Sequence, residues 1–125
     1  MEEWRAALIA LAEQTVTWIE QYYAGQGARV MHDVVLHPEP DQPLLTVEIN
    51  DRRRVHLEPT EKGAGLLPTT VNLFAYPTLR RVVLYGPVNG AWEIQSSDGI
   101  PMGYPWNAQS LIQVIDIIAG LNAAG

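Results

Sequence analysis

The stretch from Arg80 to Gln95 constrains the fold of this chain more than any other part of its sequence. Two runs of β-prone residues meet there at Asn89-Gly90, a dipeptide that accepts the positive φ values of tight hairpin turns. We therefore predict that this stretch forms an antiparallel hairpin, and that a sheet built on this hairpin lies at the centre of the fold.

The turn also predicts which side chains of this hairpin share a face. Loops of two and of four residues about Asn89-Gly90 bring the same sets of alternate residues onto one face of the hairpin. The predicted inner face therefore does not depend on which turn forms. Either turn predicts an inner face made of Val83, Tyr85, Trp92 and Ile94. The opposite face then carries Val82, Leu84, Glu93 and Gln95.

The chain has 125 residues, of which 47% are hydrophobic and 18% are charged. This length is enough for one hydrophobic core without disulfides, so we expect a single domain over residues 1–125. The absence of cysteine excludes thiol catalysis and gives no sign of export for disulfide formation. The most apolar stretch is too polar to span a bilayer, and the first residues lack a signal-peptide pattern. We expect a cytoplasmic protein that does not bind membranes.

The formal charge of -6 argues against nucleic-acid binding, because affinity for nucleic acids rests largely on neutralising phosphates. Five of the eight basic residues nevertheless gather in two clusters, Arg52–Arg54 and Arg80–Arg81. Charged strand ends that discourage edge-to-edge pairing are the simpler interpretation of these clusters. Binding of an anion or nucleic acid there is an alternative, and it predicts steeply salt-dependent affinity.

Two amphipathic helices are predicted at the two ends of the chain. Residues 3–24 place tryptophans and aliphatic side chains on one side, and Gly25 is well placed to end this helix. Asn107 is a typical N-cap residue for a second helix over residues 108–122. The polar arc of this second helix covers only about 60°, and each buried aliphatic side chain contributes about 1.5–3 kcal/mol. The helix therefore needs two neighbours: the sheet, and either the first helix or a second subunit.

Besides the central hairpin, strands are predicted over residues 28–37, 44–50 and 53–58. A three-residue turn at residues 50–52 keeps the apolar faces of the last two of these strands together. That turn predicts cross-strand pairs of Leu45 with Leu57, Thr46 with His56, Val47 with Val55 and Glu48 with Arg54.

The middle segment, residues 59–79, carries the weakest pattern. Thr69 or Thr70 is suited to cap a short helix over residues 71–75, which would end before Pro77. We therefore expect either this short helix or a loop between the third and fourth strands.

These elements define a two-layer α+β domain, in which about five strands form a mainly antiparallel sheet and both long helices pack on one face. The other face is expected to be wet and to carry Thr46, Glu48, Arg54, His56, Glu93 and Gln95. This order of elements resembles the secretion-chaperone-like fold, whose members are small, acidic, poor in cysteine and usually dimeric. The resemblance implies a second helix in the middle segment and transfers no site residues.

The sequence contains no constellation that specifies a reaction. Its three histidines, His32, His37 and His56, lack the spacing of metal ligands, and its serines lack the GxSxG nucleophile elbow. We therefore predict that the protein is not an enzyme and uses no metal or cofactor.

A non-enzymatic protein-binding module, such as an assembly factor or chaperone-like adaptor, is the function that these features favour. The wide apolar arc of the last helix also predicts a homodimer. The loop over residues 98–106 has more large apolar side chains than a solvated linker needs, so it either plugs the core or contacts a protein partner. The candidate partner-binding residues are Ile100, Met102, Tyr104 and Trp106 in this loop and Ile112 and Ile115 in the last helix.

The alternative function is that of a small enzyme or small-molecule-binding domain with a cleft between the helices and the sheet. The polar groups of such a cleft are predicted to come from His32, Tyr85 and His56. A closed pocket that contains at least two of these residues favours this alternative, and their scattering over a solvated surface argues against it.

Overall fold

The computed structural model describes residues 2–23, 29–32, 43–50, 53–60, 65–97 and 103–120. In chain order, its elements are α1 (Glu2–Tyr23), β1 (Arg29–His32), β2 (Leu45–Asn50), β3 (Arg53–Pro59), β4 (Thr69–Tyr76), β5 (Arg81–Val88), β6 (Ala91–Ser97), β7 (Tyr104–Pro105) and α2 (Ala108–Ile118). Within these residues, the strands form one seven-stranded sheet in sequence order, and all neighbouring strands are antiparallel. The sheet is therefore a meander, with the short strands β1 and β7 at its edges.

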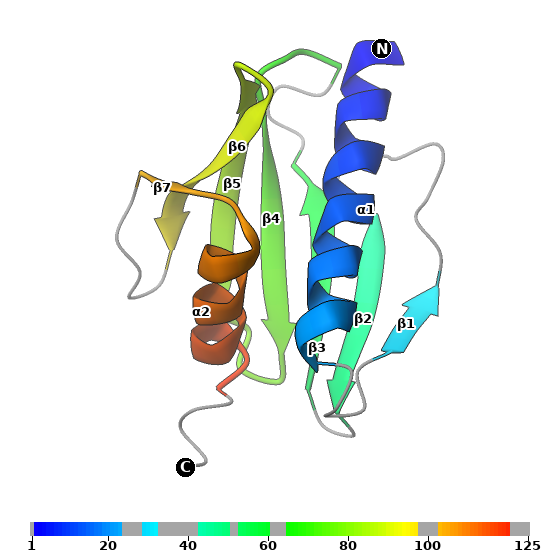
Figure 1. Cartoon of the computed structure of the whole chain (residues 1–125), viewed down its shortest axis with the longest axis vertical. Coiled ribbons are helices and arrows are strands. Elements are labelled where there is room, and N and C mark those ends of the chain that lie inside the picture. The colour runs from blue at the N-terminus through cyan, green and yellow to red at the C-terminus, as the bar shows by residue number, and fades with distance from the viewer. Residues whose placement is uncertain are drawn as a thin grey trace.

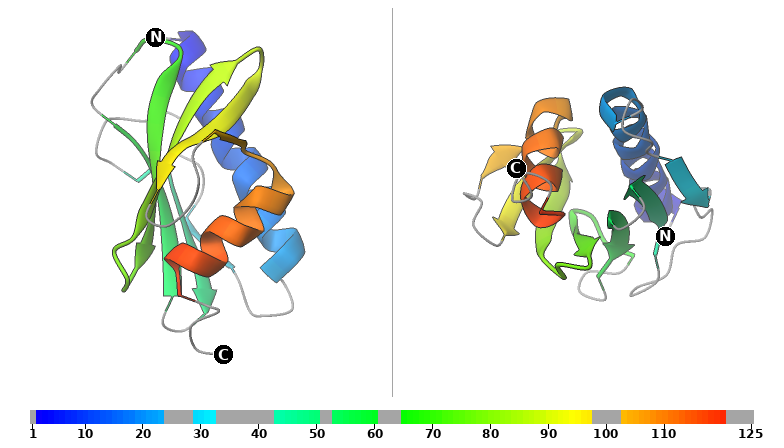
Figure 2. Two further views of the ribbon diagram at one scale, coloured as in Figure 1. Left: turned by 90° about the vertical axis from the view of Figure 1, so that its left-hand side faces the viewer. Right: turned by 90° about the horizontal axis from the view of Figure 1, so that it is seen from below.

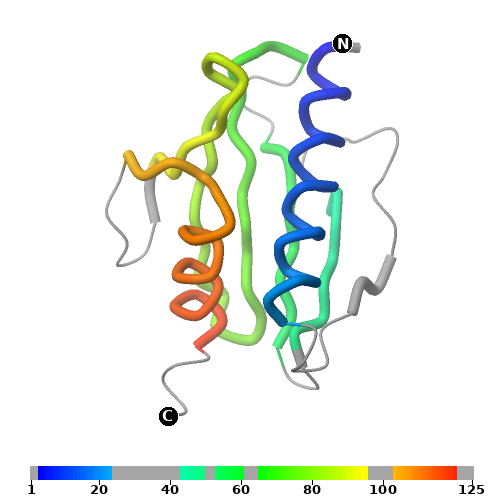
Figure 3. Tube along the Cα trace, in the orientation of Figure 1, coloured from blue at the N-terminus to red at the C-terminus, as the bar shows by residue number. Residues whose placement is uncertain are grey.

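Both helices lie on the same face of this sheet (Figure 1). Seen from below, they lie side by side, and the sheet curves around them (Figure 2). The colours of the tube show that both helices run in the same general direction, toward the end of the sheet at which β2 and β4 end (Figure 3). This arrangement confirms the predicted two-layer α+β architecture.

The hydrophobic core lies between the sheet and the helices. Every second side chain is buried along β3 and β4, as expected for strands with one covered face. The helices bury Leu8, Leu11 and Ile19 of α1 and Leu111, Val114, Ile115 and Ile118 of α2 in the same core. Each of these aliphatic side chains contributes about 1.5–3 kcal/mol by leaving water.

α2 has the two neighbours that its wide apolar surface requires. It packs against α1 and against β4 and β5. The Tyr23 hydroxyl of α1 donates a 2.7 Å hydrogen bond to Asp116 Oδ1 of α2. At the turn between β4 and β5, the Thr78 hydroxyl donates a hydrogen bond to the Ile118 carbonyl oxygen at the end of α2. The first helix thus takes the place that a second subunit could have taken.

The register of β2 and β3 follows the prediction. The structure pairs Leu45 with Leu57, Thr46 with His56, Val47 with Val55 and Glu48 with Arg54. A shift by one residue would turn the buried apolar side chains of one strand to the outer face, which is why the apolar pattern specifies the register.

The predicted short helix over residues 71–75 is wrong, because this segment belongs to strand β4. Buried side chains alternate with half-buried ones from Thr69 to Tyr76, which is the period of a strand with one covered face. A central strand therefore takes the place of the second helix that the secretion-chaperone-like resemblance implies. The sheet accordingly has more than the five strands expected.

The predicted inner face of the central hairpin is correct for β6 and wrong for β5. The core contains Val82, Leu84, Trp92 and Ile94. In β5, Val83 and Tyr85 are half-buried at the alternate positions, so they lie on the outer face of the sheet. Glu93 and Gln95 are exposed at the alternate positions of β6 and share this outer face.

A bulge in β5 causes this reversal. Val88 lies opposite Ala91, but Tyr85 lies opposite Glu93, so β5 contains one more residue than β6 over this interval. Gly86, inside the bulge, has a φ of +155°, and a Cβ atom there would lie only 2.9 Å from the Ala91 carbonyl oxygen. Glycine is required at this position because the two backbones approach so closely.

The helix boundaries lie within one residue of the predicted ones at the start and end of α1 and at the start of α2. Asn107 caps α2 in a capping box with Ser110, as its residue type predicts. The described part of the first strand is β1, and residues 28 and 33–37 of its predicted range lie outside the described residues. α2 ends at Ile118 with Ala119 as its C-cap, so the predicted end at residue 122 is wrong, and residues 121–122 lie outside the described residues. Neither of the two described helices is long and apolar enough to cross a membrane.

Candidate binding surfaces

The structure separates the six predicted partner-binding residues. Ile100 and Met102 lie outside the described residues. Tyr104 is 47% exposed on the edge strand β7, whereas Trp106, two residues later, is only 6% exposed. On α2, Ile112 is half-buried and Ile115 is completely buried. Of the four that are described, Tyr104 is therefore the one that a partner can reach most easily.

Trp106 fills the core beside α1. Its ring meets that of Trp18 edge to face, with centroids 6.4 Å apart. Its indole Nε1 donates a 3.4 Å hydrogen bond to the buried Thr15 Oγ1. A buried indole N–H with a partner is typical of a structural tryptophan. For Trp106, this placement favours the core plug over the recognition surface, and Ile115 is removed from the candidate surface by its burial.

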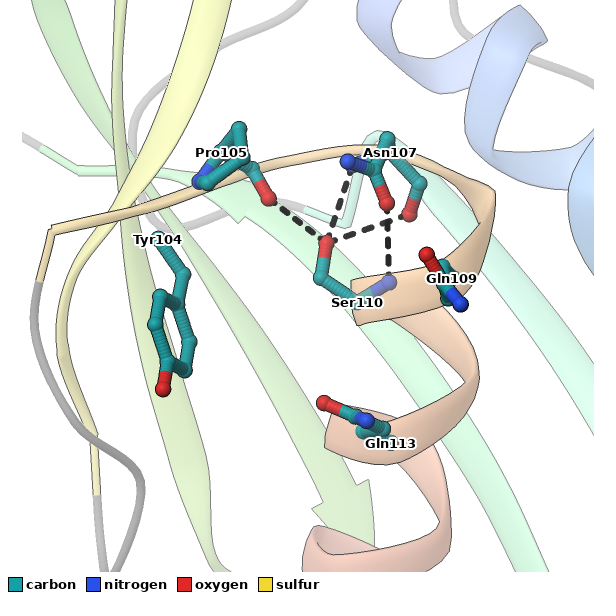
Figure 4. Close-up of a pocket in the computed structure, with 6 residues that line it drawn as sticks. All are labelled: Tyr104, Pro105, Asn107, Gln109, Ser110 and Gln113. Carbon is teal, nitrogen blue, oxygen red and sulfur yellow. Dashed lines mark hydrogen bonds between the residues drawn. The ribbon is translucent and has the colours of Figure 1, made fainter.

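An open depression of about 350 Å³ lies where β7 meets α2. It is lined by Tyr104, Pro105, Asn107, Gln109, Ser110 and Gln113. Figure 4 shows Tyr104 on the β7 side of the depression and the two glutamines on the α2 side. We call this feature the Tyr104 depression.

The wall of the Tyr104 depression is held by the N-terminal cap of α2 (Figure 4). The Ser110 backbone N–H donates to Asn107 Oδ1, and the Asn107 backbone N–H donates to Ser110 Oγ, both at 2.9 Å. The Ser110 hydroxyl also donates a 2.7 Å hydrogen bond to the Pro105 carbonyl oxygen. This last hydrogen bond joins β7 to α2, so it fixes the two sides of the depression relative to each other.

The chemistry of the depression is polar and uncharged. Among the described residues, its lining supplies the phenol ring of Tyr104 and the amides of Gln109 and Gln113, and it contains no Asp, Glu, His, Lys or Arg. The two glutamines stand four residues apart, so they share one side of the helix. Each amide both donates and accepts hydrogen bonds, as peptide groups do. Such a site can bind hydroxyl or peptide groups.

The face of the sheet that the helices leave uncovered forms a second surface, which we call the outer face. Of the six residues expected there, Arg54, Glu93 and Gln95 are exposed, Glu48 and His56 are half-buried, and Thr46 is buried. His56 Nδ1 lies 2.8 Å from the Thr46 hydroxyl oxygen. The outer face is therefore less exposed to solvent than expected.

Aromatic rings account for part of this difference. Phe74 and Tyr76 of β4 are half-buried on the outer face. The Arg54 guanidinium lies over the Tyr76 ring at 5.7 Å from its centroid, and the Arg81 guanidinium lies over the Phe74 ring at 5.8 Å. The His56 ring contacts the Tyr76 ring edge to face at 5.0 Å. Sequence reasoning missed this surface because residues 71–75 were expected to form a helix or a loop, although the β-prone Thr, Val, Phe and Tyr residues between Thr69 and Tyr76 were the available signal.

The cleft predicted for a small-molecule site is not formed by the residues proposed for it. Tyr85 and His56 lie on the outer face, turned away from the helices and separated by β4. The side chain of His32 is outside the described part of the structure. Among the described residues, no group of three or more His, Cys, Asp or Glu side chains is placed to hold a metal ion.

One ionisable group is buried between the helices. Tyr23 is completely buried, and burial raises the pKa of its phenol well above its ordinary value of about 10. The hydrogen bond to the Asp116 carboxylate raises this pKa further, because it favours the protonated phenol. The Tyr23 hydroxyl is thus a permanent hydrogen-bond donor that joins the two helices.

Comparison of this chain with protein-family models, with curated proteins and with solved structures finds no match.

Proposed function

We propose that this chain is a non-enzymatic protein-binding module, of the assembly-factor or chaperone-like adaptor type, that acts in the cytoplasm. Its partner supplies an extended segment that binds in the Tyr104 depression. The observation that carries this proposal is the Tyr104 ring, 47% exposed beside uncharged hydrogen-bonding side chains on a frame held by the α2 cap. Exposed aromatic residues on rigid elements are the usual anchors of protein interfaces.

The polar side of the depression supports a peptide rather than a charged ligand. Gln109 and Gln113 are exposed and can each pair with the N–H and C=O groups of an extended backbone. The Tyr104 ring offers an apolar surface for one side chain of that segment. A carboxylate or phosphate ligand finds no cation among the described residues that line the depression.

The proposal includes a homodimer. α2 already has α1 and the sheet as neighbours, and Ile112 packs partly against the core, so the apolar surface that α2 offers to a second copy is the half-buried Ile117. Size-exclusion chromatography with light scattering at micromolar concentration measures the mass in solution. The mass of two chains supports the dimer, and the mass of one chain removes it from the proposal.

The binding proposal is tested with a displayed library of random peptides and two matched variants. Tyr104→Ala removes the exposed ring of the depression, and Tyr22→Ala removes a ring of nearly equal exposure, 46%, on α1. We expect wild-type protein and Tyr22→Ala to enrich the same peptides. Tyr104→Ala should weaken their binding by about tenfold or more, measured by fluorescence anisotropy.

Two outcomes contradict this function. One is that the wild-type protein enriches no peptide family. The other is that both tyrosine variants lose binding to the same extent while circular dichroism shows that both are folded, because the depression would then have no specific part in recognition.

A further inference from the structure

We propose that the segment bound in the Tyr104 depression is rich in proline and adopts the polyproline II conformation. This inference rests on the proposed function, because it names the kind of peptide that the same depression accepts. Three features carry it: the short edge strand β7, two free amides on α2, and the exposed ring of Tyr104.

β7 offers almost no backbone to a partner strand. It consists of only Tyr104 and Pro105, and it lies at the edge of the described sheet. Pro105 has no N–H group, and its carbonyl oxygen already accepts the hydrogen bond from the Ser110 hydroxyl. A partner segment therefore cannot join the sheet here by a ladder of backbone hydrogen bonds, so side chains of the depression must bind its backbone instead.

Gln109 and Gln113 supply the free amides of the depression. Both side chains are exposed, and neither amide is hydrogen-bonded to another described residue. In contrast, Asn107 Oδ1 and the Ser110 hydroxyl are occupied by hydrogen bonds of the α2 cap. The two amides lie on successive turns of α2 (Figure 4). The depression can therefore donate hydrogen bonds at two points along a partner backbone.

The spacing of the two amides fits an extended partner. Positions i and i+4 of a helix lie about 6 Å apart along the helix axis. Alternate residues of a polyproline II segment lie about 6.2 Å apart, and those of a β-strand about 6.7 Å apart. A helical partner has most of its carbonyl groups in internal hydrogen bonds. The amides therefore match an extended segment, and the hydrogen-bonding groups of that segment decide between the two extended conformations.

Proline leaves a segment with carbonyl groups and few N–H groups. A polyproline II segment makes no internal hydrogen bonds, so its carbonyl oxygens are open to donors. Each proline also removes an N–H group that would otherwise need an acceptor in the depression. Such a segment requires donors from its receptor, and the two glutamine amides provide them. The Tyr104 ring, 47% exposed, offers a flat apolar surface on which a proline ring can pack.

The open shape of the depression favours a segment that is ordered before it binds. The depression has a volume of about 350 Å³ and is open to solvent, so it contacts a partner from one side only. Fixing the backbone of one flexible residue lowers affinity by roughly 5- to 30-fold. Proline restricts φ before binding, so a proline-rich segment loses less affinity in this way than a flexible segment does.

A neutral sugar fits the depression less well than a proline-rich segment does. A sugar brings several hydroxyl groups, and each hydroxyl that leaves water without a partner weakens binding. Among the described lining residues, the cap already uses Asn107 Oδ1 and the Ser110 hydroxyl, which leaves two amides and the Tyr104 hydroxyl. A proline-rich segment has fewer polar groups that need partners.

The test uses full-length protein and two displayed peptide libraries. One library is fully random, and the other is random except that it contains no proline. An enriched peptide is then synthesised with a fluorescent label, together with a version in which alanine replaces every proline. Binding of both peptides is measured by fluorescence anisotropy.

Two double variants of the protein test the amides. Gln109→Ala combined with Gln113→Ala removes both amides of the depression. Gln14→Ala combined with Gln21→Ala is the matched control, because these two glutamines are exposed on α1. Circular dichroism measures whether each double variant is folded.

We expect the random library to yield peptides with proline at every third position, the repeat that places side chains on one side of a polyproline II helix. The proline-free library should yield no peptides whose binding depends on Tyr104. Exchange of proline for alanine in the peptide, and loss of both amides of the depression, should each weaken binding by about tenfold or more. The control variant on α1 should bind the peptide as the wild type does.

Four results overturn the inference. Enrichment of peptides that depend on Tyr104 but lack proline would contradict the inference while it supports the proposed function. No enrichment from either library would contradict both. An equal loss of binding in the two folded double variants would show that the amides of the depression have no specific part in recognition. Binding of cellohexaose that depends on Tyr104, in place of peptide binding, would assign the depression to neutral sugars.

Discussion

Tyr23 shows how a single polar atom can join two elements in this protein. Its phenol ring packs edge to face on Tyr22, with centroids 4.7 Å apart, and its hydroxyl donates to Asp116 of the other helix. A buried hydroxyl without such a partner would destabilise the fold by about 1–3 kcal/mol. The hydrogen bond from Tyr23 to Asp116 thus fixes the position of α1 relative to α2.

The raised pKa of Tyr23 predicts a loss of stability at alkaline pH. Below about pH 10 the phenol is protonated in both the folded and unfolded chains, so Tyr23 adds no pH dependence there. Above about pH 10 the unfolded chain releases this proton while the folded chain retains it, so the free energy of unfolding falls as pH rises. Tyr23→Phe should lower stability by about 1–2 kcal/mol at pH 7 and flatten this alkaline decline.

Urea unfolding at a series of pH values from 7 to about 11 measures both effects, with Tyr22→Phe as the control on an exposed neighbouring ring. A Tyr23→Phe variant whose alkaline decline is as steep as that of the wild type would show that another group causes it.

At the scale of elements, the β2–β3 hairpin and the α2 cap could be predicted because local pattern and tertiary structure agree there. Val47 and Val55 must both face the core, which leaves one register, and Asn107 precedes a helix with a wide apolar side. In β4, threonines and a later proline resembled a helix cap and stop, and the alternating burial that shows a strand depends on packing against the helices.

The candidate surfaces were harder to predict than the elements. Tyr104 and Trp106 are two residues apart, and no local signal states that the first is exposed and the second is buried. The contacts of Arg54 with Tyr76 and of Arg81 with Phe74 require β4 to be a strand and Arg81 of β5 to face outward, and both features were predicted wrongly. A surface assembled from several strands is predicted correctly only if the existence and the facing direction of each strand are predicted correctly.

The bulge in β5 depends on Gly86, because the two strand backbones approach closely there. Gly86→Ala would place a Cβ atom 2.9 Å from the Ala91 carbonyl oxygen and 3.1 Å from the Trp92 Cα atom, at a φ that side chains rarely adopt. We expect a loss of about 2 kcal/mol or more in the free energy of unfolding, measured by urea denaturation.

Gly90→Ala is the matched control in the same hairpin, because Gly90 also has a positive φ but a Cβ atom added there would have no other atom within 4 Å. Its loss should be clearly smaller than that of Gly86→Ala. Equal losses would mean that backbone conformation alone, rather than close approach of the strands, explains the requirement at Gly86.

At the scale of the whole molecule, the helices and the sheet are joined at both ends of α2. Its last turn accepts a hydrogen bond from Thr78, at the turn between β4 and β5, and one of 3.4 Å from Arg80 Nη1. Its first turn is tied to β7 by Ser110, and Trp106 fills the space between that end and α1. The segment that exposes Tyr104 therefore also closes the core.

Because this segment closes the core through Trp106, the stability of the whole fold depends on that side chain. Trp106→Ala should destabilise the protein by about 3–5 kcal/mol, because it leaves a large cavity and removes the partner of the Thr15 hydroxyl. Such a loss is a large fraction of the total stability of about 5–15 kcal/mol for a domain, so a large drop in Tm is expected by circular dichroism. Tyr104→Ala, at the exposed position of the same segment, should change stability by less than about 0.5 kcal/mol. If Trp106→Ala instead remained as stable as the wild type and lost peptide binding, Trp106 would belong to the recognition surface, and the core would have to be closed by other residues.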